Sequence, residues 1–343
     1  MRRRQFIIVL GGAATWPLAG RAQQPAKRMP RLGALIGFAE NDPATQRRVA
    51  AFLKGFADLG WVADRDFTID VRYGAGDADR NRTFAKELVG LSPDVILVNS
   101  TSATAAMQRE TSTIPVVFLT VSDPVGSGFV ASLPRPGGNM TGFINVEASI
   151  AGKWLELLKE IAPRTKRAGL MFNPATATYF DYYRKPFEAA ATATGVMPIM
   201  LPVGGTADIE QAFATRDRDD GIVLMSDPFL TVNRTLTSAT ALQFRIPVVS
   251  GVSQSGSLIS YAPDTDDLFR RSASYVDKIL RGASPADLPV QLPTKFEMII
   301  NLKMAKALDL AVPPTLFGKA EFRGDIVRGT LTYRFGAPVV ARY

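Results

Sequence analysis

Short apolar segments alternate with amphipathic segments along this chain, and that alternation constrains the fold more than any other feature. The apolar segments have the length of strands, and the amphipathic ones repeat apolar residues at helical spacing. In the first series, strands are predicted at residues 31–38, 67–73, 94–98 and 115–121. Helices are predicted at 43–59, 80–90 and 102–110. Strands joined by helices in this order indicate a parallel sheet that is covered on both faces.

A loop rich in proline and glycine, residues 133–142, interrupts the pattern before a second series begins. The first helix of that series is indicated by apolar residues at helical spacing, namely Ile150, Trp154, Leu157, Leu158 and Ile161. Strands are predicted at 167–172, 196–203, 221–225 and 247–249. Helices are predicted at 180–194, 209–215 and 233–244. We therefore expect an α/β chain with two doubly wound parallel-sheet lobes.

The pattern of the last part of the chain indicates that the chain crosses between these lobes several times. Further strands and helices are predicted at 257–263, 266–281, 290–292, 296–300 and 303–310. We expect residues 31–145 and 257–286 to form lobe 1, and residues 146–256 and 287–314 to form lobe 2. Several crossings make a hinge, and a hinge between two lobes makes a cleft. Residues 315–343 form a C-terminal extension for which the sequence predicts no definite structure.

The first 22 residues have the three-part plan of an export signal. A basic start precedes an apolar stretch, and Gly20 and Ala22 provide the small residues of a cleavage site. Arg3 and Arg4 begin a stretch that resembles the twin-arginine core, although an ordinary basic start also explains them. We expect a soluble periplasmic protein, exported by the general or the twin-arginine route.

The sequence contains neither cysteine nor histidine. Thiol nucleophiles, disulfides, imidazole bases and cysteine or histidine metal sites are therefore excluded. No phosphate-binding glycine motif follows the first predicted strand. We expect no cofactor and no metal. The formal net charge is +8, but it forms no dense basic block beyond the N-terminus, so we expect no nucleic-acid partner.

Polar side chains follow most of the predicted strands. In an open parallel sheet, ligands bind beyond the carboxyl ends of the strands, so these side chains are expected to form the cleft wall. Hydroxyl, amide and carboxylate groups with a few aromatic rings suit a small polar solute. The candidate ligand-binding residues are Phe38, Asn41, Asn99, Ser100, Thr101, Ser102, Ser122, Asp123, Asn139, Thr141, Asn173, Asp227 and Tyr261.

Ser100, Thr101 and Ser102 begin a predicted helix. Their commoner role is to cap the helix, but the free N–H groups of a first turn also bind carboxylates. Both roles are compatible, and we expect these hydroxyls near a ligand carboxylate. Phe38 is a candidate for stacking on a ligand ring, although a phenylalanine at a strand end is more often part of the core.

The tripeptide Ser-Asp-Pro follows two predicted strands, at Asp123 and at Asp227. Aspartate before proline commonly begins a helix or a turn, and capping alone explains either copy. Their placement at strand ends of opposite lobes favours a second hypothesis, in which they close on the ligand together. In that hypothesis both acids and Tyr261 lie toward a ligand amine.

Several stretches of the chain resemble the ABC transporter substrate-binding protein family, which includes tryptophan/tyrosine-type uptake proteins. The stretches are RRRQFI, GRAQQPA, GWVADRDFTIDVRYGAGDADR, STIPVVFLTVSDPVGSGFVASLPRPGGNMTG, KWLELLKEIAPRTKRAGLMFNP and MAKALDLAVPPTL. The resemblance ends near Pro314, and the chain departs from the family pattern after Thr315. It implies the type I periplasmic binding fold and delivery of a small solute to an inner-membrane ABC permease. The family's cleft loops fall on residues 39–42, 99–102, 122–125, 139–142, 173, 227 and 261.

We therefore expect a monomeric solute-binding protein of an ABC importer, not an enzyme, with an amino acid or a similar small carboxylate as its ligand. A periplasmic sensor of the same fold is one alternative. The other is a cofactor-independent α/β enzyme that uses Asp123 or Asp227. Two acids on separately moving lobes are poorly preorganised for catalysis, which makes the enzyme the weaker alternative.

Overall fold

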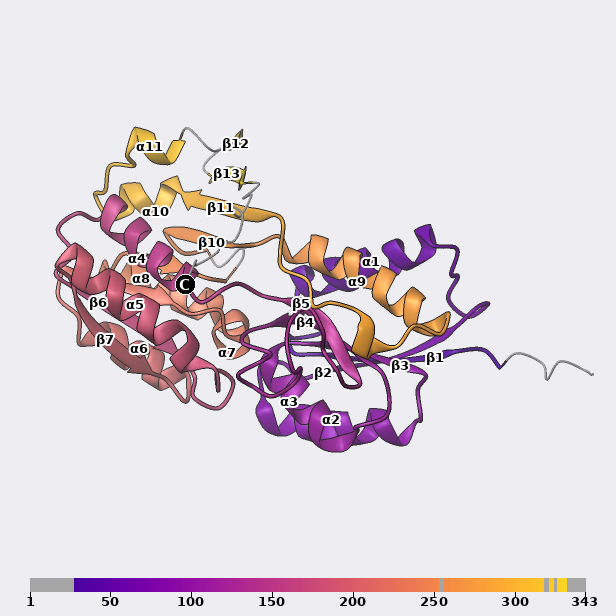
Figure 1. Ribbon diagram of the computed structural model, residues 1–343. Helices are drawn as coiled ribbons and strands as arrows, with labels where there is room; N and C mark the ends of the chain where they lie inside the picture. Colours follow the sequence, from indigo (N-terminus) through magenta and orange to yellow (C-terminus); the bar gives the residue numbers. More distant parts are fainter. Residues whose placement is uncertain (1–27, 253–255, 318–320, 324–325, 332–343) are drawn as a thin grey trace, which may run out of the picture.

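The computed structural model describes residues 28–252, 256–317, 321–323 and 326–331. The predicted export signal lies outside these residues. The described chain forms two lobes, each built on a β-sheet with helices packed against it (Figure 1). This confirms the predicted fold class of two α/β lobes with parallel-sheet cores.

Lobe 1 contains a five-stranded parallel sheet with the order β2-β1-β3-β4-β5. Its strands are β1 (Arg31–Ile36), β2 (Thr68–Tyr73), β3 (Val95–Asn99), β4 (Val116–Val121) and β5 (Met140–Ile144). Its helices are α1 (Pro43–Asp58), α2 (Ala78–Gly90), α3 (Thr101–Glu110) and α9 (Thr265–Leu280).

Side-chain alternation along the strands fixes which helices cover which face of this sheet. Ile36 packs in one apolar cluster with Phe52 of α1 and Phe269 of α9. Leu35, on the other face, packs with Leu88 of α2 and Met107 of α3. Both faces are buried, as a parallel sheet requires, and the carboxyl ends of the strands remain available for a site.

In the described residues, lobe 2 contains an eight-stranded sheet with the order β12-β13-β11-β10-β9-β8-β6-β7. The parallel part comprises β6 (Arg167–Phe172), β7 (Met197–Pro202), β8 (Asp220–Leu224), β9 (Val248–Ser250) and β10 (Ile259–Pro263). Three antiparallel strands extend it, namely β11 (Phe296–Asn301), β13 (Ile326–Leu331) and β12 (Glu321–Arg323). Its helices are α4 (Ile150–Ile161), α5 (Phe180–Thr194), α6 (Thr206–Ala214), α7 (Pro228–Val232), α8 (Arg234–Phe244), α10 (Leu302–Ala307) and α11 (Pro314–Phe317).

The chain passes between the lobes after β5, after β10 and again before β11. Gln291 lies beside lobe 1, where its carbonyl accepts a hydrogen bond from the Ile144 N–H at 2.9 Å. The chain then enters β11 in the sheet of lobe 2. The 3₁₀ turn η1 (Pro285–Asp287) also lies on the lobe 1 side of this crossing, against β5.

These crossings differ from the expected lobe boundaries. The segment 257–263 was expected in lobe 1, but β10 pairs with β9 and β11 of lobe 2. Residues 287–291 were expected in lobe 2, but Leu288 and Val290 bond to lobe 1 backbone and side chains. An apolar strand pattern shows that a segment is buried in a sheet, but it does not show which sheet.

The expected loop at 133–142 also contains the start of β5. Its proline and glycine content hid the strand. Gly142 has a φ of +153° and lies against the Phe118 backbone, where any side chain would overlap it. This glycine therefore permits close strand packing rather than marking a loop.

Candidate functional site

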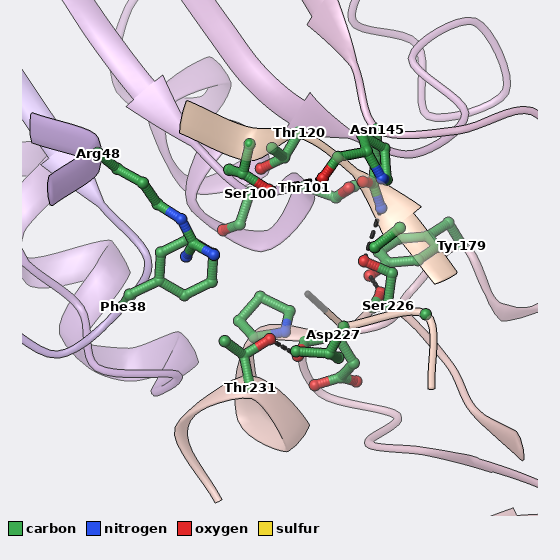
Figure 2. A pocket seen from close by; sticks show the side chains of 16 residues that line it. Phe38, Arg48, Ser100, Thr101, Thr120, Asn145, Tyr179, Ser226, Asp227 and Thr231 are labelled. Atoms are coloured by element: carbon green, nitrogen blue, oxygen red, sulfur yellow. Dashed lines mark hydrogen bonds between the residues drawn. The ribbon is translucent and has the colours of Figure 1, made fainter. Parts of the chain in front are cut away.

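A cavity of about 40 Å³, here called the interlobe cavity, lies between the two lobes (Figure 2). Its size leaves room for only a few water molecules. Its walls come from the ends of β1, β3, β4, β8 and β10 and from loops and helices beside them. The lining residues are Phe38, Arg48, Ser100, Thr101, Thr120, Asn145, Tyr179, Ser226, Asp227, Pro228, Thr231, Gly251, Val252, Ala262, Pro263 and Thr265.

The lobe 1 wall is formed by strained turns at the ends of β3 and β4. Ser100 has a φ of +86° and Thr120 a φ of +50°, which are uncommon for residues with a side chain. The Ser100 hydroxyl caps α3 by accepting a hydrogen bond from the Ala103 N–H at 3.3 Å. Thr101 accepts one from the Ser122 N–H at 2.9 Å, which ties the two turns together. Strain of this kind gathers at binding sites, where the surrounding structure maintains it.

Arg48 of α1 is a buried cation in the lobe 1 wall. The residue is 4% exposed, and its buried Nε and Nη1 atoms have no hydrogen-bond partner among the residues that the structure describes. Its Nε lies 3.8 Å from an Asp266 oxygen, and its guanidinium lies 4.9 Å from the centre of the Phe38 ring. Burial lowers the pKa of Arg48 to about 10, so the side chain is charged at neutral pH.

Asp227 of lobe 2 is also buried at the cavity, but its oxygens are already used. It accepts hydrogen bonds from the N–H groups of Asn173 and Leu230 and from the Thr176 hydroxyl, at 3.0 to 3.1 Å. It thereby caps α7 and holds the loop after β6. Burial outweighs these hydrogen bonds and raises the pKa of Asp227 to about 6.

Direct contacts join the lobes around the cavity. Arg234 at the start of α8 donates to Asp42 at the start of α1 at 2.6 Å. Ser122 and Tyr183 share a hydrogen bond of 2.9 Å between their hydroxyls. Gly76 of lobe 1 lies against α7, where an added Cβ would come within 3.2 Å of the backbone. The lobes are therefore in a closed arrangement.

The structure brings seven of the predicted site residues to the cavity or directly behind it. Phe38, Ser100, Thr101 and Asp227 line it. Asn99 donates to Thr120 at 2.6 Å, Ser102 lies 3.4 Å from the Ser100 hydroxyl, and Ser122 bonds to Thr101. An eighth residue, Asn173, reaches the site through its backbone bond to Asp227.

The other five predicted residues do not line the cavity. Asn41 is exposed, and Asp123 accepts a hydrogen bond from the Gly126 N–H within its own turn. Tyr261 stacks on Phe296, away from the cavity. The remaining two serve the lobe 1 framework: Asn139 donates to Ile114 O and Thr141 donates to Leu288 O. Asn139 precedes β5 and so lies at the wrong end of the strand for a cleft residue.

Arg48 was the main residue that the sequence prediction missed. It occupies the buried stripe of α1, together with Thr45, Phe52 and Phe56. An arginine on the apolar stripe of a helix was therefore the signal, because such a position normally holds an apolar residue. No comparable sequence feature marked Asn145, Tyr179 and Thr231. These residues reach the cavity only because the folded chain brings their segments together.

Comparison with known proteins agrees with this architecture. The profile of the ABC transporter substrate binding protein family matches residues 34–322. A tyrosine-binding protein of Clostridioides difficile is 25% identical over 78% of each chain. A conserved domain protein of Vibrio cholerae is 25% identical, with a TM-score of 0.78 over 85% of this chain and 98% of its own. An ABC domain of Streptococcus pneumoniae in complex with L-Trp is 23% identical, with a TM-score of 0.74 over 84% of this chain and 97% of its own.

The similar folds include a periplasmic sugar-binding protein of Legionella pneumophila, so the two lobes have the type I periplasmic binding protein-like fold. The family match covers well over half of the sequence, and the shared fold extends through both lobes. This chain belongs to the ABC transporter substrate-binding protein family.

Proposed function

We propose that this chain is the solute-binding protein of an ABC importer, which captures a small carboxylate between its lobes and delivers it to a membrane permease. The observation that carries this proposal is the interlobe cavity, whose walls come from both lobes at the carboxyl ends of their strands. A ligand bound there contacts both lobes only when they are closed. Binding energy therefore favours closure.

An aromatic amino acid or a close analogue is the ligand class that the site supports best. Phe38 and Tyr179 supply aromatic surface, and Ser100 and Thr101 supply hydroxyls beside the charged Arg48. The tyrosine-binding relative and the solved domain that holds L-Trp support the same class.

Opening of the lobes is required for this function. A cavity of about 40 Å³ is smaller than an aromatic amino acid, so the lobes lie farther apart than in this structure both when the ligand enters and when it is bound. Closure around the ligand, less complete than in this structure, then brings Asp227 and Tyr179 of lobe 2 against it. The permease recognises the closed surface, because closure is the change that reports ligand binding to the outside.

The proposal includes export of a monomer to the periplasm, directed by the predicted N-terminal signal. Among the helices of the described residues, none combines the length and the apolar character needed to cross a bilayer.

The experiment is a thermal-unfolding screen of the chain without residues 1–22, with the amino acids and aromatic carboxylates as ligands. Saturation at about 100 times Kd adds about 2.7 kcal/mol to stability, which raises Tm by several degrees. Failure of every compound to raise Tm would contradict the proposal. Ligand turnover would instead support the enzyme alternative.

Uptake of the labelled ligand by cells that lack the gene distinguishes an importer component from a sensor. An importer component is required for uptake. If uptake persists and only a response to the ligand is lost, the sensor is correct.

A further inference from the structure

Arg48 is a buried cation whose charge is incompletely matched. Its Nε and Nη1 donate to no acceptor within the described residues, and the Asp266 oxygen at 3.8 Å is beyond hydrogen-bonding distance. A buried charged donor without an acceptor carries a desolvation cost of several kcal/mol. Because this position lies on the buried stripe of α1, an apolar residue there would make the folded protein more stable.

The neighbouring acids are shared among three arginines. Asp42 caps α1 and pairs with Arg234 at 2.6 Å, while Asp266 lies 3.6 Å from Arg47. Each of these carboxylates therefore lies closer to another arginine than to Arg48, so neither neutralises Arg48 fully. An anion in the interlobe cavity would supply the missing partner for Arg48.

A helix amino terminus lies on the same cavity. The ten-residue helix α3 begins at Thr101, and its cap residue Ser100 also lines the cavity. The first turn of a helix offers N–H groups and a partial positive charge to anions. Figure 2 shows the Arg48 and Ser100 side chains extending into the same region of the site.

Among the described residues that line the cavity, an ammonium group has no comparable partner. Asp227 is the one acid among the described residues that line the cavity, and both of its oxygens already accept hydrogen bonds from Asn173, Thr176 and Leu230. A carboxylate has about four lone-pair sites, so little acceptor capacity remains for a ligand amine.

We propose that Arg48 and the amino end of α3 form an anion subsite for the carboxylate of the ligand, and that an ammonium group adds little to affinity. The solute class is thus the aromatic carboxylates, of which aromatic amino acids are one part. This inference rests on the proposed function, because it assumes that the solute binds in the interlobe cavity.

The test is calorimetry with two matched ligand series on the chain without residues 1–22. The first is L-tyrosine, 3-(4-hydroxyphenyl)propionate and tyramine, and the second is L-tryptophan, indole-3-propionate and tryptamine. In the series that binds, we expect the amino acid and the propionate to agree within about tenfold. We expect the amine to bind at least about 100-fold more weakly, because it leaves Arg48 unpaired.

Arg48→Met keeps the side-chain stem and removes the charge. It is expected to weaken both carboxylate ligands by at least about 100-fold. Arg48→Lys keeps the charge without the planar fork and is expected to recover part of that loss. Arg47→Met is the matched control: this neighbour also lies near Asp266 but does not line the cavity, and it should change affinity less than about twofold. Unchanged affinity in Arg48→Met, or amines that bind as well as the amino acids, would overturn the inference.

Thermal unfolding without ligand separates this inference from the proposed function. Loss of an unpaired buried cation should leave Tm of Arg48→Met unchanged or raised. A Tm lowered by several degrees would show that Arg48 serves the fold through Asp266, and would overturn the subsite. If the wild-type chain binds none of the six compounds, the aromatic form of the proposed function fails, and the unfolding comparison alone decides the role of Arg48.

Discussion

The two Ser-Asp-Pro turns stand at similar places in the two lobes, yet their aspartates have different surroundings. Asp123 follows β4 with a φ of +47°, is half-buried, and accepts a hydrogen bond from the Gly126 N–H at 2.9 Å. Asp227 follows β8 in extended conformation, is 1% exposed, and accepts hydrogen bonds from three residues. The first acid shapes its own turn, whereas the second joins a helix and a neighbouring loop.

The residues after each tripeptide explain this difference. Gly126 allows the chain to fold back over Asp123, because any side chain at that position would overlap the aspartate. After Asp227 the chain continues into α7, so that carboxylate meets the free N–H groups of a first helical turn. The two copies of the tripeptide therefore both follow a strand, but their aspartates have different structural roles. Of the two aspartates, only Asp227 reaches the interlobe cavity.

Asp227→Ala should give the largest effect. It removes the cap of α7 and leaves the Asn173 N–H and the Thr176 hydroxyl without their acceptor, which together cost about 3 kcal/mol of unfolding free energy. Urea denaturation measures this loss. Asp123→Ala is the matched control and should cost about 1 kcal/mol. Equal losses at the two positions would remove the distinction between the turns.

Gly126→Ala should destabilise the protein by about 1 to 2 kcal/mol, because the new Cβ overlaps the Asp123 carboxylate. The double variant with Asp123→Ala should recover part of the loss, since the overlapping group is then absent. Urea denaturation of the two single variants and the double variant gives the coupling energy. Simple additivity would contradict the proposed contact.

Arg234→Ala tests a further difference between the turns. The Asp227 turn leads through α7 to α8, which begins at Arg234 and carries the interlobe ion pair with Asp42. The pair is partly exposed, so its loss should weaken ligand affinity by only about five- to tenfold, through easier opening. Calorimetry of this variant and of Asp42→Asn measures the effect. An affinity unchanged in both would show that the pair does not favour closure.

A further expected effect is a pH dependence of stability. The pKa of Asp227 is raised to about 6 in the folded protein, above its value of about 3.9 in an unfolded chain. The folded state therefore binds the proton more tightly, and the contribution of Asp227 to stability falls as pH rises from about 4 to about 6. Carboxyl ¹³C NMR should show a titration near pH 6 that disappears in Asp227→Asn. A midpoint below 4 would contradict it.

Much of the fold could be predicted from the sequence, because strands such as β3 and helices such as α4 carry strong local patterns. The lobe boundaries could not be predicted as well. The apolar sequence of strand β10 would suit the sheet of either lobe. Only its pairing with β9 and β11 assigns it to lobe 2. Strand β5 was obscured because its glycine is required by close packing rather than by a turn.

The candidate site could also be predicted only in part from the sequence. Ser100, Thr101 and Asp227 follow strands, so the rule that ligands bind at strand ends located them. Arg48 lies one turn inside α1 and reaches the cavity from the side, where that rule does not apply. Asn139 and Thr141 were assigned to the cleft because β5 was taken as a loop, which reversed the end at which they lie.

The most direct test of capture between the lobes is the distance between them with and without ligand. The native sequence has no cysteine, so Gln46→Cys in α1 and Thr235→Cys in α8, both exposed positions, give two specific spin labels. Pulsed electron resonance should show a broad distance distribution that becomes shorter and narrower with the solute that raises Tm. An identical distribution at saturating ligand would contradict capture by closure of the two lobes.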